Sequence, residues 1–229
     1  MADNLRKYLA EFLGTAAIVA AVVGAGHMVT SLGADQTLGL AVIAVTVAAV
    51  LFVVINLLMP ISGAQFNPIV TLAFGIRKEI SAAVGFFYIV SQFLGAVSGA
   101  VLANLMFDHQ AVVSGVVQRM SANTFIGEIV ASAGLVLIVL VLVDHNKLGL
   151  IGVSVACWIA AGHIFTSSTS FANPAVTFGR SFTDAVTGIE LGSVGGFMVA
   201  QLIGAGLALG LALALKQKKE IKCLTQFHR

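Results

Sequence analysis

Two copies of the pattern Asn-Pro-x-Val-Thr, one beginning at Asn67 and the other at Asn173, are the residues whose types and spacing point to chemistry. Each copy opens an apolar run of roughly eight residues, much shorter than the ~20 residues that a helix needs to cross a bilayer. Asparagine is a favoured helix N-cap and proline a favoured first helical residue. We therefore expect two half-helices, and each asparagine amide should remain free to donate hydrogen bonds.

Two half-helices that enter a membrane from opposite faces would bring their N-terminal ends together at the midplane. The helix dipole makes these ends positive, so they would repel cations. A water molecule between the two asparagines would accept a hydrogen bond from both, and its protons would point away from them. Because this breaks a hydrogen-bonded proton wire, the motif predicts a pore for uncharged molecules.

The composition places these motifs in a membrane protein. Hydrophobic residues make up 59% of the chain and charged residues 10%, whereas soluble domains carry about 25% charged residues. The formal net charge of +2 does not indicate a nucleic-acid partner. Hydropathy predicts six spans, at roughly 8–31, 37–59, 80–106, 123–143, 148–166 and 190–215.

The two halves of the chain repeat one another. Glu11 in the first span matches Glu128 in the fourth, and Gln92 in the third span matches Gln201 in the sixth. Each half contains three spans, and an odd number of spans places the second half upside down in the membrane. The landmarks therefore predict an inverted repeat.

Lysine and arginine predict the orientation of the spans. Only Arg119 and Arg180 would lie on the side opposite the termini. By the positive-inside rule both termini are then cytoplasmic, in the plasma (inner) membrane. The first repeat is expected at 1–110 and the second at 111–229, which includes a short basic cytoplasmic tail. The other ten basic residues are Arg6, Lys7, Arg77, Lys78, Lys147, Lys216, Lys218, Lys219, Lys222 and Arg229.

At the Asn-Pro boxes the sequence resembles the aquaporin, or major intrinsic protein, family, whose signature is a pair of Asn-Pro-Ala boxes. The resemblance covers residues 5–215 and implies an all-α membrane protein. It implies six transmembrane helices plus two re-entrant half-helices, arranged as an inverted repeat of two three-helix halves, and a homotetramer with one pore per subunit. The boxes here are Asn67, Pro68 and Ile69, and Asn173, Pro174 and Ala175.

The resemblance also assigns four positions of an outer selectivity filter, namely Val47, His163, Ser170 and Val176. Val47 stands where water channels usually have phenylalanine and glycerol channels tryptophan. Val176 stands where most of the family has arginine. The loop from His163 to the second box is two residues shorter than is usual in the family, so Ala161 is an alternative to His163.

Three charged residues near the expected pore leave alternatives open. Arg180 lies one helical turn beyond Val176 and either charges the vestibule or faces lipid headgroups. Glu11 and Glu128 are the only charges well inside the long spans, and such residues are functional candidates. In the family the corresponding glutamates accept hydrogen bonds from the re-entrant loops. The alternative for both is a proton relay.

The resemblance predicts a passive channel for water and small uncharged solutes. Val47 and Val176 together resemble a bacterial branch found with arsenic-resistance genes, which adds glycerol-like polyols and metalloid acids such as arsenite. The alternatives are an ion- or proton-coupled secondary transporter built on an inverted repeat, and an intramembrane scaffold with a closed pore.

Enzyme activity is not expected, because none of the common catalytic motifs occurs in the sequence. Cys157 and Cys223 show no metal-ligand spacing, so we expect no metal site and no cofactor. The expected partners are water, small neutral solutes, the lipid bilayer and further copies of the chain.

Overall fold

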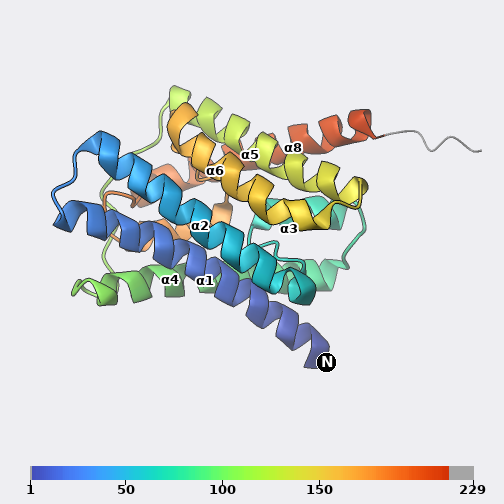
Figure 1. Ribbon diagram of the computed structural model, residues 1–229, viewed down its shortest axis with the longest axis horizontal. Helices are drawn as coiled ribbons and strands as arrows, with labels where there is room; N and C mark the ends of the chain where they lie inside the picture. Colours follow the sequence, from blue (N-terminus) through green and yellow to red (C-terminus); the bar gives the residue numbers. More distant parts are fainter. Residues whose placement is uncertain (1, 217–229) are drawn as a thin grey trace, which may run out of the picture.

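The computed structural model describes residues 2–216, and this part of the chain is helical (Figure 1). Most of the expected basic tail, with Lys218, Lys219, Lys222 and Arg229, lies outside the described residues. The elements are α1 (Ala2–Ser31), α2 (Gln36–Ser62), α3 (Pro68–Ile76), α4 (Ala82–Met106), α5 (Ala122–Asp144), η1 (Leu148–Leu150), α6 (Ile151–Phe165), α7 (Pro174–Gly179), η2 (Arg180–Phe182) and α8 (Leu191–Leu215).

Six helices are long and apolar enough to cross a membrane: α1, α2, α4, α5, α6 together with η1, and α8. The two short helices, α3 and α7, begin at the two Asn-Pro boxes. This arrangement confirms the expected fold class. Both ends of the described chain lie at the same end of the bundle, on the right in Figure 1.

Two helix boundaries differ from the hydropathy prediction. Helix α1 begins at Ala2, because the polar residues before the apolar span still form helical turns. Helix α2 continues through Pro60 to Ser62, because Pro60 lies in the last turn and the Gly63 N–H still bonds to the Met59 carbonyl at 3.1 Å. It ends at Gly63, whose φ of 87° is a left-handed conformation that glycine adopts without strain.

The outer surface of the bundle is apolar. Large side chains such as Val45, Leu57 and Leu213 are 67%, 66% and 71% exposed. A soluble protein rarely exposes apolar patches of this extent, whereas a bilayer solvates them. The chain is therefore an integral, multi-pass membrane protein.

Glycines allow the spans to approach closely. Helix α1 packs against α4, and α5 packs against α8. A Cβ atom at Gly95 would overlap the Phe12 carbonyl oxygen on α1, and one at Gly204 would lie 2.5 Å from the Ile129 carbonyl oxygen on α5. The small residues of α4 and α8 thus serve packing within the bundle.

We predict that Gly95→Ala destabilises the protein, because the new methyl group has no space against the α1 backbone. Overpacking of this kind typically costs about 1–3 kcal/mol. The thermal unfolding temperature in detergent should fall. Gly206→Ala is the matched control, since no described atom outside the adjacent backbone of its own helix lies within 4 Å of a Cβ at that position. Equal unfolding temperatures for the two variants would contradict the packing argument.

Candidate pore and constriction

The first re-entrant loop is held by a buried carboxylate on α1. Glu11 is fully buried, and it accepts hydrogen bonds from the backbone N–H groups of Gln65 (3.0 Å) and Phe66 (2.6 Å). The Ser62 hydroxyl and the Gln92 amide also donate to Glu11, at 2.6 and 2.7 Å. All four partners are donors, so Glu11 acts as an anchor for the loop that leads into α3.

The second loop repeats this arrangement. Glu128 on α5 is fully buried and accepts from the backbone N–H groups of Phe171 and Ala172, both at 2.9 Å. The Gln201 amide donates to Glu128 at 2.6 Å and to the Thr177 hydroxyl at 2.8 Å. The two glutamates therefore bond to the re-entrant loops, as the family resemblance implied.

These bonds hold an unfavourable backbone. Ala64 and Phe66 have φ values of 48° and 47°, and Ser170 and Ala172 have 51° and 47°. Such left-handed conformations cost of order 1–3 kcal/mol for residues with a side chain. They occur three residues and one residue before each box asparagine, so both loops make the same turn. The turn aims the backbone N–H groups at the buried carboxylates.

Each box asparagine caps its half-helix. The side-chain oxygen of Asn67 accepts from the N–H of Ile69 at 3.1 Å, and that of Asn173 accepts from the N–H of Ala175 at 3.0 Å. The prolines that follow occupy the first helical position of α3 and α7. Capping leaves the amide NH2 of each asparagine to donate elsewhere.

The two half-helices are joined at their N-terminal ends. The amide of Asn67 donates to the Ala172 carbonyl, and the amide of Asn173 donates to the Phe66 carbonyl, both at 2.8 Å. An amide NH2 carries two hydrogens, so one hydrogen of each asparagine remains available. From the sequence we expected each amide to be free, so this crossed pair of hydrogen bonds was not predicted.

Two cavities meet beside the second half-helix. The larger has a volume of about 590 Å³, and its lining includes both box asparagines and apolar side chains of α1, α2, α5 and α6. The smaller has a volume of about 300 Å³. His163 and Arg180 line both cavities. We call these two residues the constriction.

The position of His163 follows from the phase of α6. Residues two apart on a helix point in directions about 200° apart, so His163 and Ala161 cannot face the same space. His163 is buried and lines both cavities, whereas Ala161 is exposed. Nδ1 of His163 lies 2.8 Å from the Ile159 carbonyl. A carbonyl only accepts, so Nδ1 carries a hydrogen and Nε2 is the free nitrogen of the neutral ring.

Arg180 reaches the constriction from the end of α7. It is only 3% exposed, and Nε donates to the Thr187 carbonyl at 2.5 Å. The guanidinium lies 3.4 Å from the centre of the Phe171 ring, within the range of a cation–π contact. Of the two alternatives for Arg180, the structure therefore places the side chain at the vestibule and away from the lipid.

The other expected filter residues line the larger cavity. Val47, Ser170 and Val176 are all buried in its wall. The Ser170 hydroxyl is buried from solvent and has no hydrogen-bond partner among the described residues. The remaining box residues, Pro68, Ile69, Pro174 and Ala175, are buried at the starts of the half-helices and do not line either cavity.

Three residues of the site were not found from the sequence. Phe171 supports Arg180, and the Thr187 backbone orients it. Arg119 lines the smaller cavity and donates to the Gly188 carbonyl at 2.6 Å. Burial lowers the pKa of Arg119 to about 10, so it remains charged at neutral pH. Phe171 lies two residues before the second box, and this position could have identified it as a site residue. Thr187 and Arg119 belong to no motif.

Known proteins similar to this chain share both its length and its fold. A family model described as major intrinsic protein matches residues 1–170. Aquaglyceroporin AqpS from Rhizobium meliloti (strain 1021) is 40% identical over 94% of this chain and 92% of that protein. Aquaporin TIP2-3 from Arabidopsis thaliana is 32% identical over 90% of this chain and 85% of that protein.

Among solved structures, the aquaglyceroporin from Plasmodium falciparum superposes with a TM-score of 0.72. The superposition covers 96% of this chain and 97% of that chain, with 20% sequence identity. At this identity the likeness concerns the fold alone.

We predict that Glu128→Gln destabilises the second re-entrant loop. Glutamine replaces one carboxylate oxygen by an NH2 group, so one of the two loop N–H groups then faces a donor. A buried group left without a partner costs about 1–3 kcal/mol. The thermal unfolding temperature should fall, whereas Glu190→Gln, at an exposed glutamate whose side chain makes no cap, should leave it unchanged. Equal behaviour of the two variants would remove Glu128 as an anchor.

Proposed function

Because this chain belongs to the major intrinsic protein family, we propose that it forms a passive channel for water and small uncharged solutes such as glycerol. The observation that carries the proposal is the meeting of two cavities at His163 and Arg180, next to the joined ends of the half-helices. A solute would pass from one cavity to the other through this constriction.

Exclusion of charged species would occur at two levels of the pore. At the asparagines, two positive helix ends repel cations, and the free amide hydrogens orient a water molecule as an acceptor. At the constriction, Arg180 adds a full positive charge in a buried setting, where charges act strongly. The sequence predicted the first level from the Asn-Pro boxes and left the direction of Arg180 open; the cation–π contact of Arg180 with Phe171 supports the second level.

The side chains that line the larger cavity support the proposal that the solute is a polyol. Val47 and Val176 offer apolar contact, while Nε2 of His163 offers a hydrogen-bonding group. A polyol has an apolar carbon side and a row of hydroxyl groups, so it matches such a wall. Two of the similar proteins are named aquaglyceroporins. We extend the proposed solutes to metalloid acids such as arsenous acid, the protonated and uncharged form of arsenite, which is of similar size.

A coupled transporter is not favoured. It would need a titratable group that the solute or ion reaches, and the buried acids Glu11 and Glu128 are occupied by donors from the re-entrant loops. The similar proteins are named as aquaporins and aquaglyceroporins. We therefore propose transport by diffusion, without catalysis or coupling.

Orientation and assembly are part of the same proposal. Basic residues gather at the helix ends on the side of the bundle where the described chain begins and ends; they include Arg6, Lys7, Lys147 and Lys216. By the positive-inside rule this supports cytoplasmic termini in the plasma membrane. We propose two repeats, 1–110 and 111–229, and a homotetramer with one pore per subunit. The outer surface is predominantly apolar, which is compatible with both lipid and neighbouring copies.

We predict that proteoliposomes containing the protein swell in a glycerol gradient, at equal rates with and without a proton or sodium gradient. Light scattering after rapid mixing measures the rate. Empty liposomes are the control, and sorbitol tests the size limit. Swelling that requires an ion gradient would indicate the transporter, and absence of both water and glycerol flux would indicate a closed scaffold.

We predict that Val176→Arg lowers glycerol flux at least about tenfold, which corresponds to a barrier about 1.4 kcal/mol higher, while water flux is retained. The long side chain narrows the path and adds a second positive charge near Arg180. Val116→Arg is the matched control and should leave glycerol flux unchanged, because Val116 is 70% exposed in the loop after α4 and lines neither cavity. Glycerol flux that is unchanged in Val176→Arg would show that this position does not limit the path.

A further inference from the structure

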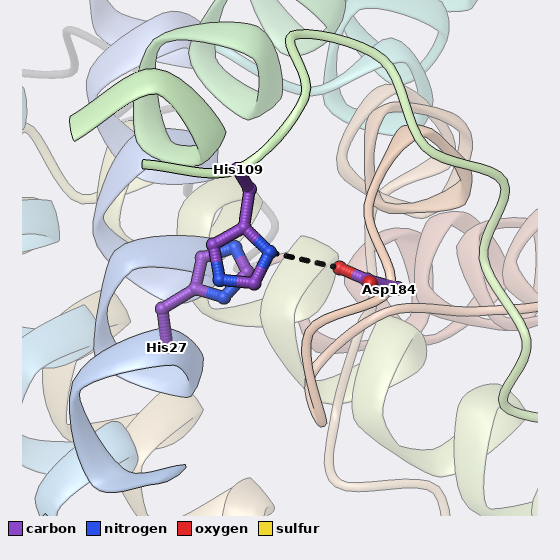
Figure 2. Close-up of side chains that lie close together, drawn as sticks. All are labelled: His27, His109 and Asp184. Atoms are coloured by element: carbon purple, nitrogen blue, oxygen red, sulfur yellow. Dashed lines mark ion pairs between the residues drawn. The ribbon is translucent and has the colours of Figure 1, made fainter. Parts of the chain in front are cut away.

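A second group of polar residues lies at the end of the bundle where α1 ends, apart from the constriction. His27 comes from α1, His109 from the loop after α4, and Asp184 from the loop after η2 (Figure 2). Each residue offers one ligand atom, and these atoms all lie within 4.8 Å of one another. From the sequence we expected no metal site, because the two cysteines lack metal-ligand spacing. These three residues were missed, since they are far apart in the chain and form no motif.

The hydrogen bonds of Asn104 define the state of His27. The Asn104 amide nitrogen donates to the carbonyls of Ala111 (3.2 Å) and Phe182 (2.9 Å), which identifies its oxygen as the acceptor. That oxygen accepts from the Thr183 hydroxyl at 2.7 Å and lies 3.1 Å from Nε2 of His27. Nε2 must therefore carry the hydrogen, and Nδ1 holds the lone pair. No hydrogen bond among the described residues engages this Nδ1.

A histidine held in this way is typical of metal centres. Metal-binding histidines commonly donate their other N–H to a carbonyl or carboxylate oxygen, which fixes the tautomer and the ring orientation. His27 is buried and so provides a rigid ligand. His109 and Asp184 have side chains 40% exposed and an Nδ1–Oδ1 distance of 3.6 Å. Their exposure makes both side chains accessible to water.

We propose that His27, His109 and Asp184 bind a divalent late first-row transition metal ion such as Zn²⁺. Two imidazoles and one carboxylate are ligands that Zn²⁺ prefers, and three protein ligands plus water complete a tetrahedral set. The centres of the two histidine rings are 4.2 Å apart and their planes are inclined by 33°, so we expect the exposed His109 ring to reorient when the ion binds. Hard cations such as Ca²⁺ prefer oxygen ligands and are excluded by this set.

Metal binding at this site would join three separate segments. Asp184 belongs to the loop 183–190, whose Thr187 carbonyl accepts from Arg180 and whose Ile189 N–H donates to the Arg180 carbonyl at 3.1 Å. The ion would tie this loop to α1 and to the loop after α4. It would thus stabilise the segment that orients Arg180, although it would not contact the constriction.

Zn²⁺ binding to the purified full-length protein, prepared without a polyhistidine tag, tests the proposal. In every sample Cys157 and Cys223 are replaced by serine and His228 by alanine, so that these groups do not contribute. Isothermal titration should give one saturable Zn²⁺ site per chain and none for Ca²⁺. Zn²⁺ should also raise the thermal unfolding temperature, since a ligand that binds only the folded state stabilises it.

Two variants and one control locate the site. His109→Ala and Asp184→Asn each remove a ligand from an exposed side chain, so the fold should persist while Zn²⁺ affinity falls at least about tenfold. His145→Ala removes another exposed histidine, at the opposite end of the bundle, and should leave the affinity unchanged. Absence of saturable Zn²⁺ binding, or an affinity unchanged in both ligand variants, would overturn the proposal.

Discussion

The bonds from two buried carboxylates to backbone N–H groups decide where the candidate pore lies. Helices α3 and α7 have nine and six residues, which is too short for a helix to be stable on its own. The loops before them are irregular, and irregular backbone at membrane depth needs internal partners for its polar groups. Glu11 and Glu128 provide those partners from neighbouring spans. The crossed asparagine bonds and the cavities beside them depend on this anchoring.

Much of the fold could be predicted because it depends on patterns between residues that are close in the sequence. Hydropathy located six spans, and each Asn-Pro pair located the start of a half-helix. The repeated glutamates and glutamines marked equivalent positions in the two halves. Helix ends were less accurate, because hydropathy does not register polar helical turns such as those before Tyr8, nor a proline tolerated near the end of α2.

The sequence predicted a site residue correctly only where its position depends on a single helix or loop. Counting residues could not decide between His163 and Ala161, whereas the phase of α6 decides it at once. Arg180 had two possible directions, and the choice depends on Phe171 and on the Thr187 backbone, which lie in other segments. The grouping of His27 with His109 and Asp184 likewise depends on tertiary contacts that leave no local pattern.

The crossed bonds between the box asparagines and the facing loop carbonyls have a consequence for regulation. Because the tips of the two half-helices are bonded to each other, neither can withdraw without breaking buried hydrogen bonds in a low-dielectric interior. The middle of the proposed conduit is therefore a fixed aperture and a poor place for a gate. Opening and closing would have to take place at the mouths, where loops and exposed side chains can move at little cost.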